Sequence, residues 1–329
     1  MATTVNLAFE QFKIDIVNLL KSDTEKARTS RDWLITQLKD FPTTIMDFPL
    51  DYPEKHIKYG SFARNTKIRP LDDIDLMYCL HGSNAYYQQD FFDSKKYHIK
   101  TENSSTELKS LSDENILNSI KVVNKIVKSL STVSNYSNAE IKRNQEAAIL
   151  NLSSYTWKFD IVPCFYTVSG FYLIPDGNGN WKATNPILDQ NNTSSTNLNY
   201  GGKVLPLIRI LKYWNTNFVS PKIGSYLFEV IVLNFVKSRS ALDNYIDCNI
   251  RDFFNYLQNA IFYDIQDPKS IDGNINDLTN DQRLRISTKA QSCYETALTA
   301  IDFEVNQSNQ EKAIENWGKI FGDKFPTYE

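Results

Sequence analysis

The spacing of apolar residues divides the chain into helical and strand-like stretches. Apolar side chains recur every three or four positions over residues 6–20, which predicts an amphipathic helix, and a similar pattern predicts another helix over residues 24–38. Prolines then break the periodicity between residues 40 and 54. The apolar-rich run at residues 73–80 is short enough to be a buried strand.

The middle of the chain favours strands. Residues 81–107 are polar and rich in Ser, Asn, Gln and Tyr, which is typical of a surface insertion or flexible loop. Residues 113–130 have helical spacing. Strand-like segments follow at residues 139–143, 147–152, 156–166 and 171–174, and a turn at residues 175–180.

Helical periodicity dominates the remainder of the chain. The polar run at residues 189–197 has little apolar surface to bury and is interpreted as a linker or loop. The order of elements predicts an α+β fold, with a mixed sheet flanked by helices in residues 1–200 and an all-helical lobe in residues 201–329. Helices in that lobe are predicted over residues 203–217, 224–237, 250–262, 281–303 and 310–321.

The charge balance narrows the classes of partner. The 329 residues include 36 Lys and Arg against 39 Asp and Glu, a formal net charge of −3. Binding to long nucleic acids through counterion release needs a broad basic surface, so the balance disfavours activation by DNA or RNA.

Cysteine spacing and hydropathy indicate the compartment. The four cysteines are far apart and form no C-x-x-C, which disfavours a zinc site or a disulfide framework and suits a reducing environment. No apolar run reaches membrane-spanning length, and the first residues lack the basic-then-apolar layout of a signal peptide. We therefore expect a cytoplasmic protein without membrane attachment.

Two carboxylates lie two positions apart in the predicted strand 73–80. Successive side chains of a strand point to opposite faces, so Asp73 and Asp75 share one face while Ile74 turns into the core. Without a counter-charge the two would repel, and one would take up a proton. The arrangement favours a divalent cation. Mg²⁺, with Mn²⁺ as an alternative, binds a few carboxylate oxygens together with substrate phosphates.

A third carboxylate is needed if two such ions share one phosphoryl-transfer site. Asp160 lies inside the apolar segment TWKFDIVPCF, where an acidic residue is costly unless a metal ion or a partner compensates its charge. Glu146 and Asp176 sit near predicted turns and are weaker candidates. We expect Asp73, Asp75 and Asp160 to be the catalytic residues and the metal ligands, around two Mg²⁺ ions.

A glycine–serine pair precedes these carboxylates. Gly60 and Ser61 open a predicted helical turn, which directs backbone N–H groups and a hydroxyl at an anion. A lone D-x-D motif is more often a solvated edge, and a lone Gly-Ser pair a helix cap, but together they indicate binding of nucleotide phosphates. No G-x-x-x-x-G-K-[ST] motif occurs, which removes the P-loop alternative. Three basic residues follow nearby: Arg64, Lys67 and Arg69. Of these, we expect Arg64 to contact the nucleotide.

These motifs resemble the signature of the polymerase-beta-like nucleotidyltransferases, in which a Gly-Ser pair precedes D-x-D and a distant third Asp lies on a neighbouring strand. The segments GSFARNT, DDIDLM and KFDIVPCF resemble, more narrowly, the bacterial CD-NTases, the DncV-like relatives of cyclic GMP-AMP synthase and oligoadenylate synthase. The resemblance covers most of residues 56–278. It implies a bilobed fold whose helical lobe closes the active-site cleft.

The resemblance continues into the C-terminal half. LIRILKYWN and GSYLFEVIVLNF resemble paired helices in which a Lys contacts the triphosphate and a Ser-Tyr pair contacts phosphate and base. By position these roles fall to Lys212, Ser225 and Tyr226. On the residues alone, Lys212 could equally be a solvated lysine and Tyr226 a core aromatic. Residues 267–278 resemble a diverged copy of the family's Asp-Pro…Asn loop.

The resemblance implies a metal-dependent synthase of cyclic di- or oligonucleotide second messengers, in anti-phage signalling of the CBASS type. Its substrates would be ATP, with GTP or pyrimidine NTPs as further candidates, and a separate effector would respond to the product. Two alternatives stay open. One is transfer to another acceptor, by a template-independent RNA-tailing or CCA-adding enzyme or one that modifies a protein or drug. The other is a non-catalytic nucleotide sensor, which should have lost the metal carboxylates.

Overall fold

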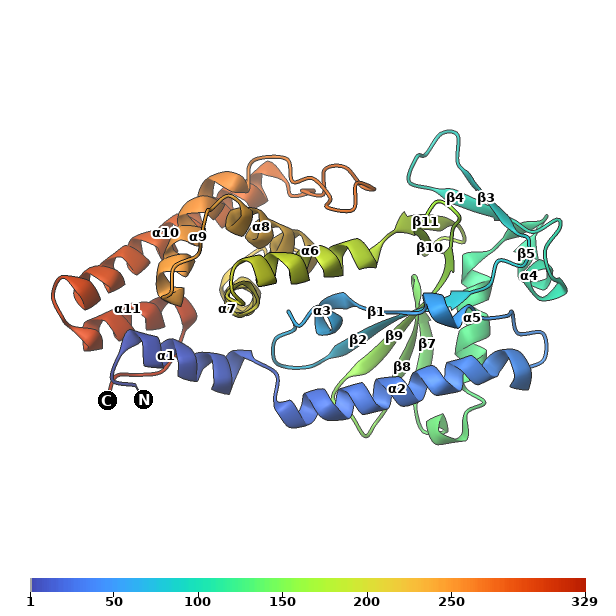
Figure 1. The fold of residues 1–329 in the computed structure, drawn as a ribbon, viewed down its shortest axis with the longest axis horizontal. Coiled ribbons are helices and arrows are strands. Elements are labelled where there is room, and N and C mark those ends of the chain that lie inside the picture. Colours follow the sequence, from blue (N-terminus) through green and yellow to red (C-terminus); the bar gives the residue numbers. More distant parts are fainter. Residues whose placement is uncertain (1) are drawn as a thin grey trace. The chain divides into compact units, whose positions relative to one another are not determined.

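The computed structural model describes residues 2–329, which form two compact units (Figure 1). The sheet unit comprises Leu20–Asn65 and Pro70–Gln190. The helical unit comprises the described part of Met1–Leu19, the short segment Thr66–Arg69, and Asn191–Glu329. By contacts, the N-terminal helix therefore groups with the C-terminal helices, which differs from a single division of the chain at residue 200.

Within residues 2–329, eleven strands form one mixed sheet in the sheet unit. Its main path runs β1-β2-β9-β10-β11-β4-β6-β5, while β8 pairs with β9 and with β7, and β3 pairs with β4. The central strands β2 and β9 are parallel. The strands are β1 Ile57–Tyr59, β2 Asp73–Leu80, β3 Tyr86–Gln89, β4 Tyr97–Lys100, β5 Ser112–Asp113, β6 Ile116–Leu117, β7 Glu140–Asn144, β8 Ala147–Asn151, β9 Lys158–Tyr166, β10 Tyr172–Pro175 and β11 Trp181–Thr184.

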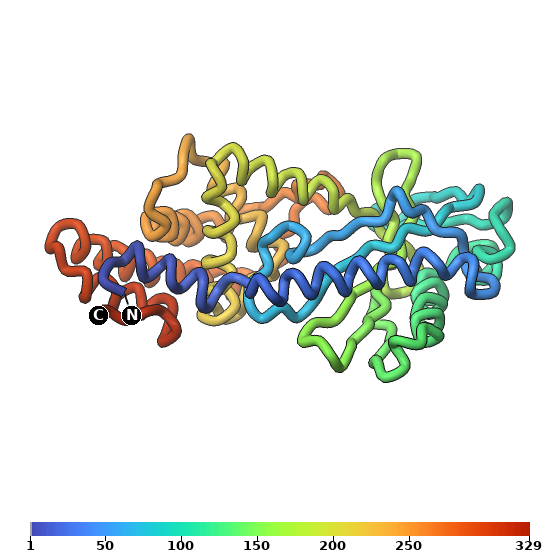
Figure 2. Tube along the Cα trace, turned by 60° about the horizontal axis from the view of Figure 1, so that its bottom comes forward, coloured from blue at the N-terminus to red at the C-terminus, as the bar shows by residue number. Residues whose placement is uncertain are grey.

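Helix α2 packs on one face of this sheet. The Tyr78 hydroxyl of β2 donates to the Leu38 carbonyl of α2 at 2.9 Å, so the even-numbered side chains of β2 point towards α2. The odd-numbered side chains, including Asp73 and Asp75, therefore lie on the opposite face. Figure 2 shows α2 as one long helix. The helices are α2 Lys21–Thr44, η2 Pro53–Lys55, α3 Gly60–Ala63, α4 Thr106–Ser110, α5 Ser119–Leu130 and η3 Ser134–Tyr136.

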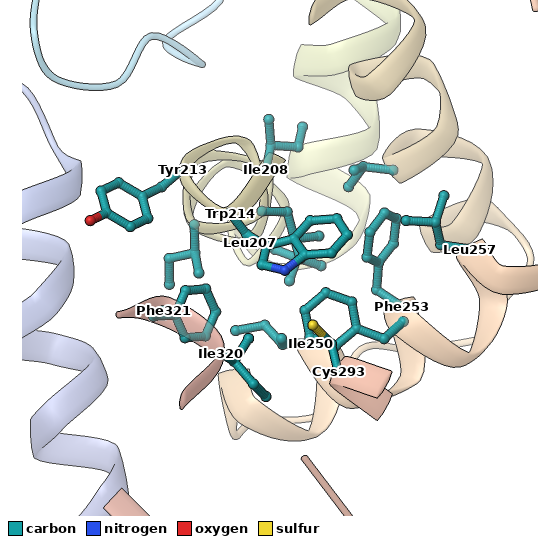
Figure 3. Close-up of a cluster of buried hydrophobic side chains, with 14 of the residues drawn as sticks. Leu207, Ile208, Tyr213, Trp214, Ile250, Phe253, Leu257, Cys293, Ile320 and Phe321 are labelled. Atoms are coloured by element: carbon teal, nitrogen blue, oxygen red, sulfur yellow. The ribbon is translucent and has the colours of Figure 1, made fainter. Parts of the chain in front are cut away.

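The helical unit is built around a large aromatic and aliphatic core (Figure 3). Trp214 packs against Phe254, with ring centroids 4.8 Å apart, and Ile250, Phe253 and Cys293 lie around it. This fold confirms the predicted α+β class. The helices are α1 Val5–Phe12, the π-helix η1 Lys13–Val17, α6 Pro186–Asn199, which enters the unit from the sheet unit, α7 Val204–Phe218, α8 Ser225–Lys237, α9 Ile246–Ala260, α10 Asn280–Val305 and α11 Gln310–Phe321.

Helix α1 is fixed to the C-terminal helices by Phe9. Its fully buried ring lies 5.1 Å from that of Trp317 and 5.0 Å from that of Phe325. We expect Phe9→Ala to lower the free energy of unfolding by about 3–5 kcal/mol, because a large buried ring leaves a cavity. Urea unfolding measures this, with Leu7→Ala as the control from the same helix, since Leu7 is 51% exposed. Equal small losses in both variants would contradict this packing role.

The predicted linker at residues 189–197 is wrong, because these residues lie inside helix α6. Pro186 occupies the first helical position, where its missing N–H costs nothing. Thr193 and Thr196 are buried, and the Thr196 hydroxyl donates to the Asn192 carbonyl at 2.7 Å. Because two of the buried positions of this helix are threonines, a search for apolar periodicity does not find it.

Two further predictions need correction, and the bounds of a third change. Residues 81–107, predicted as a surface insertion or flexible loop, contain the antiparallel β3–β4 hairpin and the start of α4; the strand alternation was hidden because β3 is largely exposed. The helix predicted from residue 113 begins at Ser119, where the Asn118 side chain accepts from the N–H groups of Ile120 and Lys121. Helix α2 extends beyond its predicted end and passes through Pro42.

No helix in residues 2–329 combines the length and the apolar character needed to cross a membrane.

Candidate functional site

The three predicted acidic residues lie on one face of the sheet, on the adjacent parallel strands β2 and β9. Asp75 is in register with Asp160, and Asp73 is in register with Lys158. Residues in register on neighbouring strands point to the same face, about 4.8 Å apart. All three carboxylates are half-buried. The strand pairing thus brings Asp160 beside Asp75; we call the face carrying Asp73, Asp75, Lys158 and Asp160 the acid face.

Gly60 is required by the position of Asp75. Strand β1 pairs antiparallel with β2 so that Tyr59 lies opposite Asp75, and α3 begins at the next residue. Gly60 has φ +77°, and a Cβ atom there would lie 1.8 Å from Asp75 Oδ2. Only a residue without a side chain allows this approach. The Gly-Ser pair therefore adjoins the acid face, with Ser61 in the first turn of α3 and Arg64 as its half-buried C-cap.

Lys158 is a site residue that the sequence analysis missed. Its Nζ donates to both carboxylate oxygens of Asp160, at 2.9 Å each. The two side chains are 37% and 21% exposed, respectively. The signal was present, because K-x-D in a strand places both side chains on one face just as D-x-D does.

Tyr59 is a second residue that the sequence did not reveal. Burial, together with the nearby carboxylates Asp75 and Asp160, holds the pKa of its phenol well above the ordinary value. The hydroxyl therefore stays protonated at neutral pH. Tyr59 is a neutral hydrogen-bond donor beside the acid face.

The acid face fits a hard divalent cation by its chemistry. No group of three or more His, Cys, Asp or Glu side chains in the described residues is already arranged around a metal position, and Asp160 is engaged by Lys158. The donors nevertheless are carboxylate oxygens at adjoining strand positions, which suit Mg²⁺ or Mn²⁺. The space beside Gly60 accommodates the carboxylate of Asp75.

The two weaker acidic candidates have local partners. Glu146, in the turn between β7 and β8, forms an ion pair with Lys182 of β11. Asp176 Oδ1 accepts from the N–H groups of Asn178 and Asn180, at 2.7 and 3.0 Å, and so shapes the turn between β10 and β11. These contacts give both residues structural roles.

In the helical unit, Lys212 of α7 is buried and lies in an ion pair. Its Nζ donates to Glu229 Oε1 of α8 at 2.6 Å, and the two side chains are only 8% and 4% exposed. The Thr66 hydroxyl donates to the same oxygen at 3.0 Å. Lys212 is therefore not the solvated lysine that an amphipathic helix alone would suggest.

The segment that contains Thr66 is anchored at its other end by Arg69. The Arg69 guanidinium donates to the carbonyls of Ile14, Asp15 and Asn18 around η1. These are carbonyls that the end of a helix leaves unpaired. Arg69 thus has a structural role.

Ser225 is the exposed first residue of α8, and Tyr226 is held by the loop after α9. The Tyr226 hydroxyl donates to Asp267 Oδ1 at 2.8 Å and accepts from Lys269 Nζ at 2.7 Å. Lys269 Nζ also lies 4.0 Å from the centroid of the Tyr226 ring. Tyr226 is partly buried at the edge of the core and fixed in orientation.

Asp267 and Asn276 organise the loop that resembles the Asp-Pro…Asn element. Asp267 accepts from the N–H groups of Lys269, Ile271 and Asp272. Burial raises its pKa, but the hydrogen bonds from Tyr226, Asp272 and Lys269 outweigh this, and the net pKa is lowered. Asn276 Nδ2 donates to the carbonyls of Ile261 and Tyr263 at 2.9 Å each.

The structure thus groups the predicted site residues within two units. Gly60, Ser61, Asp73, Asp75 and Asp160 lie in the sheet unit, as does Arg64. Lys212, Ser225 and Tyr226 lie in the helical unit.

Comparison with known proteins places the chain in a family. Residues 112–197, which include β9 and Asp160, match the Second Messenger Oligonucleotide or Dinucleotide Synthetase domain. The chain is 44% identical to a probable cyclic nucleotide synthase of Bacillus cereus strain VD146 over 336 aligned positions, which cover 100% of both chains.

Solved structures share the fold. E. coli MS115-1 CdnC, solved with ATP and in a complex with HORMA-deltaN, superposes with a TM-score of 0.71 at 18% identity, covering 98% of each chain. Vibrio cholerae DncV, a cyclic AMP-GMP synthase solved with the linear intermediate pppA(3′,5′)pG, has a TM-score of 0.68 at 10% identity and covers 99% of this chain and 97% of its own. By its full-length identity to the Bacillus relative, the chain belongs to the bacterial cyclic nucleotide synthases, the DncV-like CD-NTases.

Proposed function

We propose that this nucleotidyltransferase joins NTPs into a cyclic di- or oligonucleotide at the acid face. The observation that carries the proposal is the register of β2 with β9, which sets Asp160 beside Asp75, together with the close approach of Asp75 to Gly60. A chain that kept the fold but only sensed nucleotides would have no need for three adjacent carboxylates.

The reaction needs two kinds of transfer, and the first is repeated when the ring contains more than two nucleotides. In the first, a ribose hydroxyl oxygen of one nucleotide forms a bond to the α-phosphorus of another, and the bond from that phosphorus to pyrophosphate breaks. In the second, the free hydroxyl of the linear intermediate attacks its own α-phosphate, which closes the ring and releases a second pyrophosphate. Asp160 orients the attacking hydroxyl and accepts its proton, as a positioned carboxylate can.

Asp73, Asp75 and Asp160 would hold two Mg²⁺ ions, for which Mn²⁺ could substitute. When bound, such ions lower the pKa of the attacking hydroxyl and stabilise charge on the leaving pyrophosphate. The chain's own contribution is to hold three carboxylates at adjoining positions of two rigid strands. Tyr59 can donate a hydrogen bond beside them.

We assign nucleotide contacts to Gly60, Ser61, Arg64, Lys212, Ser225 and Tyr226. For Lys212 the supporting observation is that its ammonium group donates to one acceptor within residues 2–329, Glu229. An ammonium has three N–H donors, so two are available to phosphate oxygens. For Tyr226 it is the fixed orientation of a ring that could stack on a base, a contact worth roughly 1–3 kcal/mol.

ATP is the first candidate substrate, since the structurally similar E. coli CdnC is solved with ATP, and GTP or pyrimidine NTPs are further candidates. We place the product in anti-phage signalling of the CBASS type, with a separate effector that responds to it. The complex of E. coli CdnC with HORMA-deltaN supports a search for a protein partner as well.

Incubation with all four NTPs and Mg²⁺, with no added acceptor, tests the proposal. We expect pyrophosphate release and small products that resist phosphatase. Release that occurs only after RNA is added would instead indicate an RNA-tailing enzyme. Calorimetric NTP binding with no pyrophosphate release would indicate a sensor.

A further inference from the structure

The acid face carries a positive charge of its own. Lys158 and Asp160 are two apart on β9, and they stand in register with Asp73 and Asp75 on β2. The four side chains therefore occupy the corners of one small square on the same face of the sheet. Three are acidic and one is basic.

Lys158 forms an ion pair with the third carboxylate, Asp160. Lys158 Nζ lies 2.9 Å from Oδ1 and 2.9 Å from Oδ2 of Asp160, so both oxygens accept from one ammonium. A metal ion at this carboxylate would therefore have to compete with the ammonium group for the same two oxygens. The contact is partly screened, since the two side chains are 37% and 21% exposed, and it is therefore weak enough to exchange.

We propose that Lys158 is a built-in counter-cation of the acid face, which holds Asp160 until a divalent cation displaces it. The inference rests on the proposed function only in that the acid face binds the metal. Asp73 and Asp75 would receive the first ion, and Asp160 would join the coordination when Lys158 swings away. Lys158 is thus a positioning residue that sets the metal concentration at which the site is complete.

Mn²⁺ binding to the full-length chain, measured by calorimetry without nucleotide, tests this proposal. Lys158→Met has a side chain of similar length and no charge. We expect its Kd for Mn²⁺ to fall by about fivefold, because the competitor is gone, in line with the strength of a partly exposed ion pair. We also expect a lower Tm without metal and a larger rise in Tm on adding Mn²⁺, because the variant lacks the ion pair between Lys158 and Asp160.

Two further variants distinguish displacement of Lys158 by the metal ion from a general effect of protein charge on metal binding. Lys142→Met removes a lysine that pairs with Glu140 on β7 and should leave the Kd within about twofold of the wild-type value. In an Asp160→Asn background, Lys158→Met should bring no gain, because the pair is already broken. An unchanged Kd in Lys158→Met, or an equal gain in the Asp160→Asn background, would overturn the proposal. A wild-type protein that forms no cyclic product would refute the proposed function and leave this result standing.

Discussion

Replacing Asp73 and Asp75 together by alanine is expected to abolish product formation and leave the protein folded. Both side chains are only half-buried and belong to the acid face rather than to the apolar core, so we expect the double variant to stay folded. Without them the site has no strong ligand for a cation on β2. Pyrophosphate release from mixed NTPs and Mg²⁺ should fall by about a thousandfold or more, as when developing charge loses its stabilisation.

Glu140→Ala is the matched control for this double variant. Glu140 is an exposed acidic residue on β7 of the same sheet, and it should retain full activity. Thermal unfolding of all three proteins shows whether the double variant is folded. Pyrophosphate release at the wild-type rate in Asp73→Ala/Asp75→Ala would sink the assignment of the acid face.

Gly60→Ala is expected to cost at least about a hundredfold in activity with only a modest loss of stability. The added methyl group would lie 1.8 Å from Asp75 Oδ2, so the carboxylate or the turn must move. The left-handed backbone conformation, φ +77°, adds strain of about 1–3 kcal/mol. Initial rates and urea unfolding measure the two effects.

Gly201→Ala is the control that separates the effect of backbone strain from the effect of the steric conflict with Asp75. Gly201 has φ +65°, and a Cβ atom there would meet nothing within 4 Å. This variant should lose a similar amount of stability and keep its activity. If Gly60→Ala retained more than about half of the wild-type rate, the close approach of Asp75 to the Gly-Ser turn would have no catalytic importance.

The part of the site that could be predicted from the sequence is the part that follows from the two-residue period of a strand. The alternation of a strand is enough to put Asp73 and Asp75 on one face, and β2 spans Asp73–Leu80 as expected. The pairing of Asp160 with Asp75 could only be assumed, since the strands are far apart in the chain and no local pattern specifies a parallel neighbour. The roles of these residues stay predictions.

Side chains whose role depends on a distant partner were not predictable. Glu229 looks like one acidic residue in an apolar helix until α7 and α8 pack and bring Lys212 to it. Lys158 is different, because its partner Asp160 is only two positions away and the K-x-D spacing could have revealed the pair. Helices were well predicted where apolar residues line one face. The prediction failed for α6, because its buried positions include Thr193 and Thr196.

The identity of the product tests the central claim most directly. Mass spectrometry of the products formed from all four NTPs with Mg²⁺ should find a molecule in which every phosphate bridges two nucleosides, with no terminal phosphate. The same product should be missing from the Asp73→Ala/Asp75→Ala reaction. A final product that is linear and keeps its 5′-triphosphate, or a wild-type protein that consumes no NTP, would contradict the account.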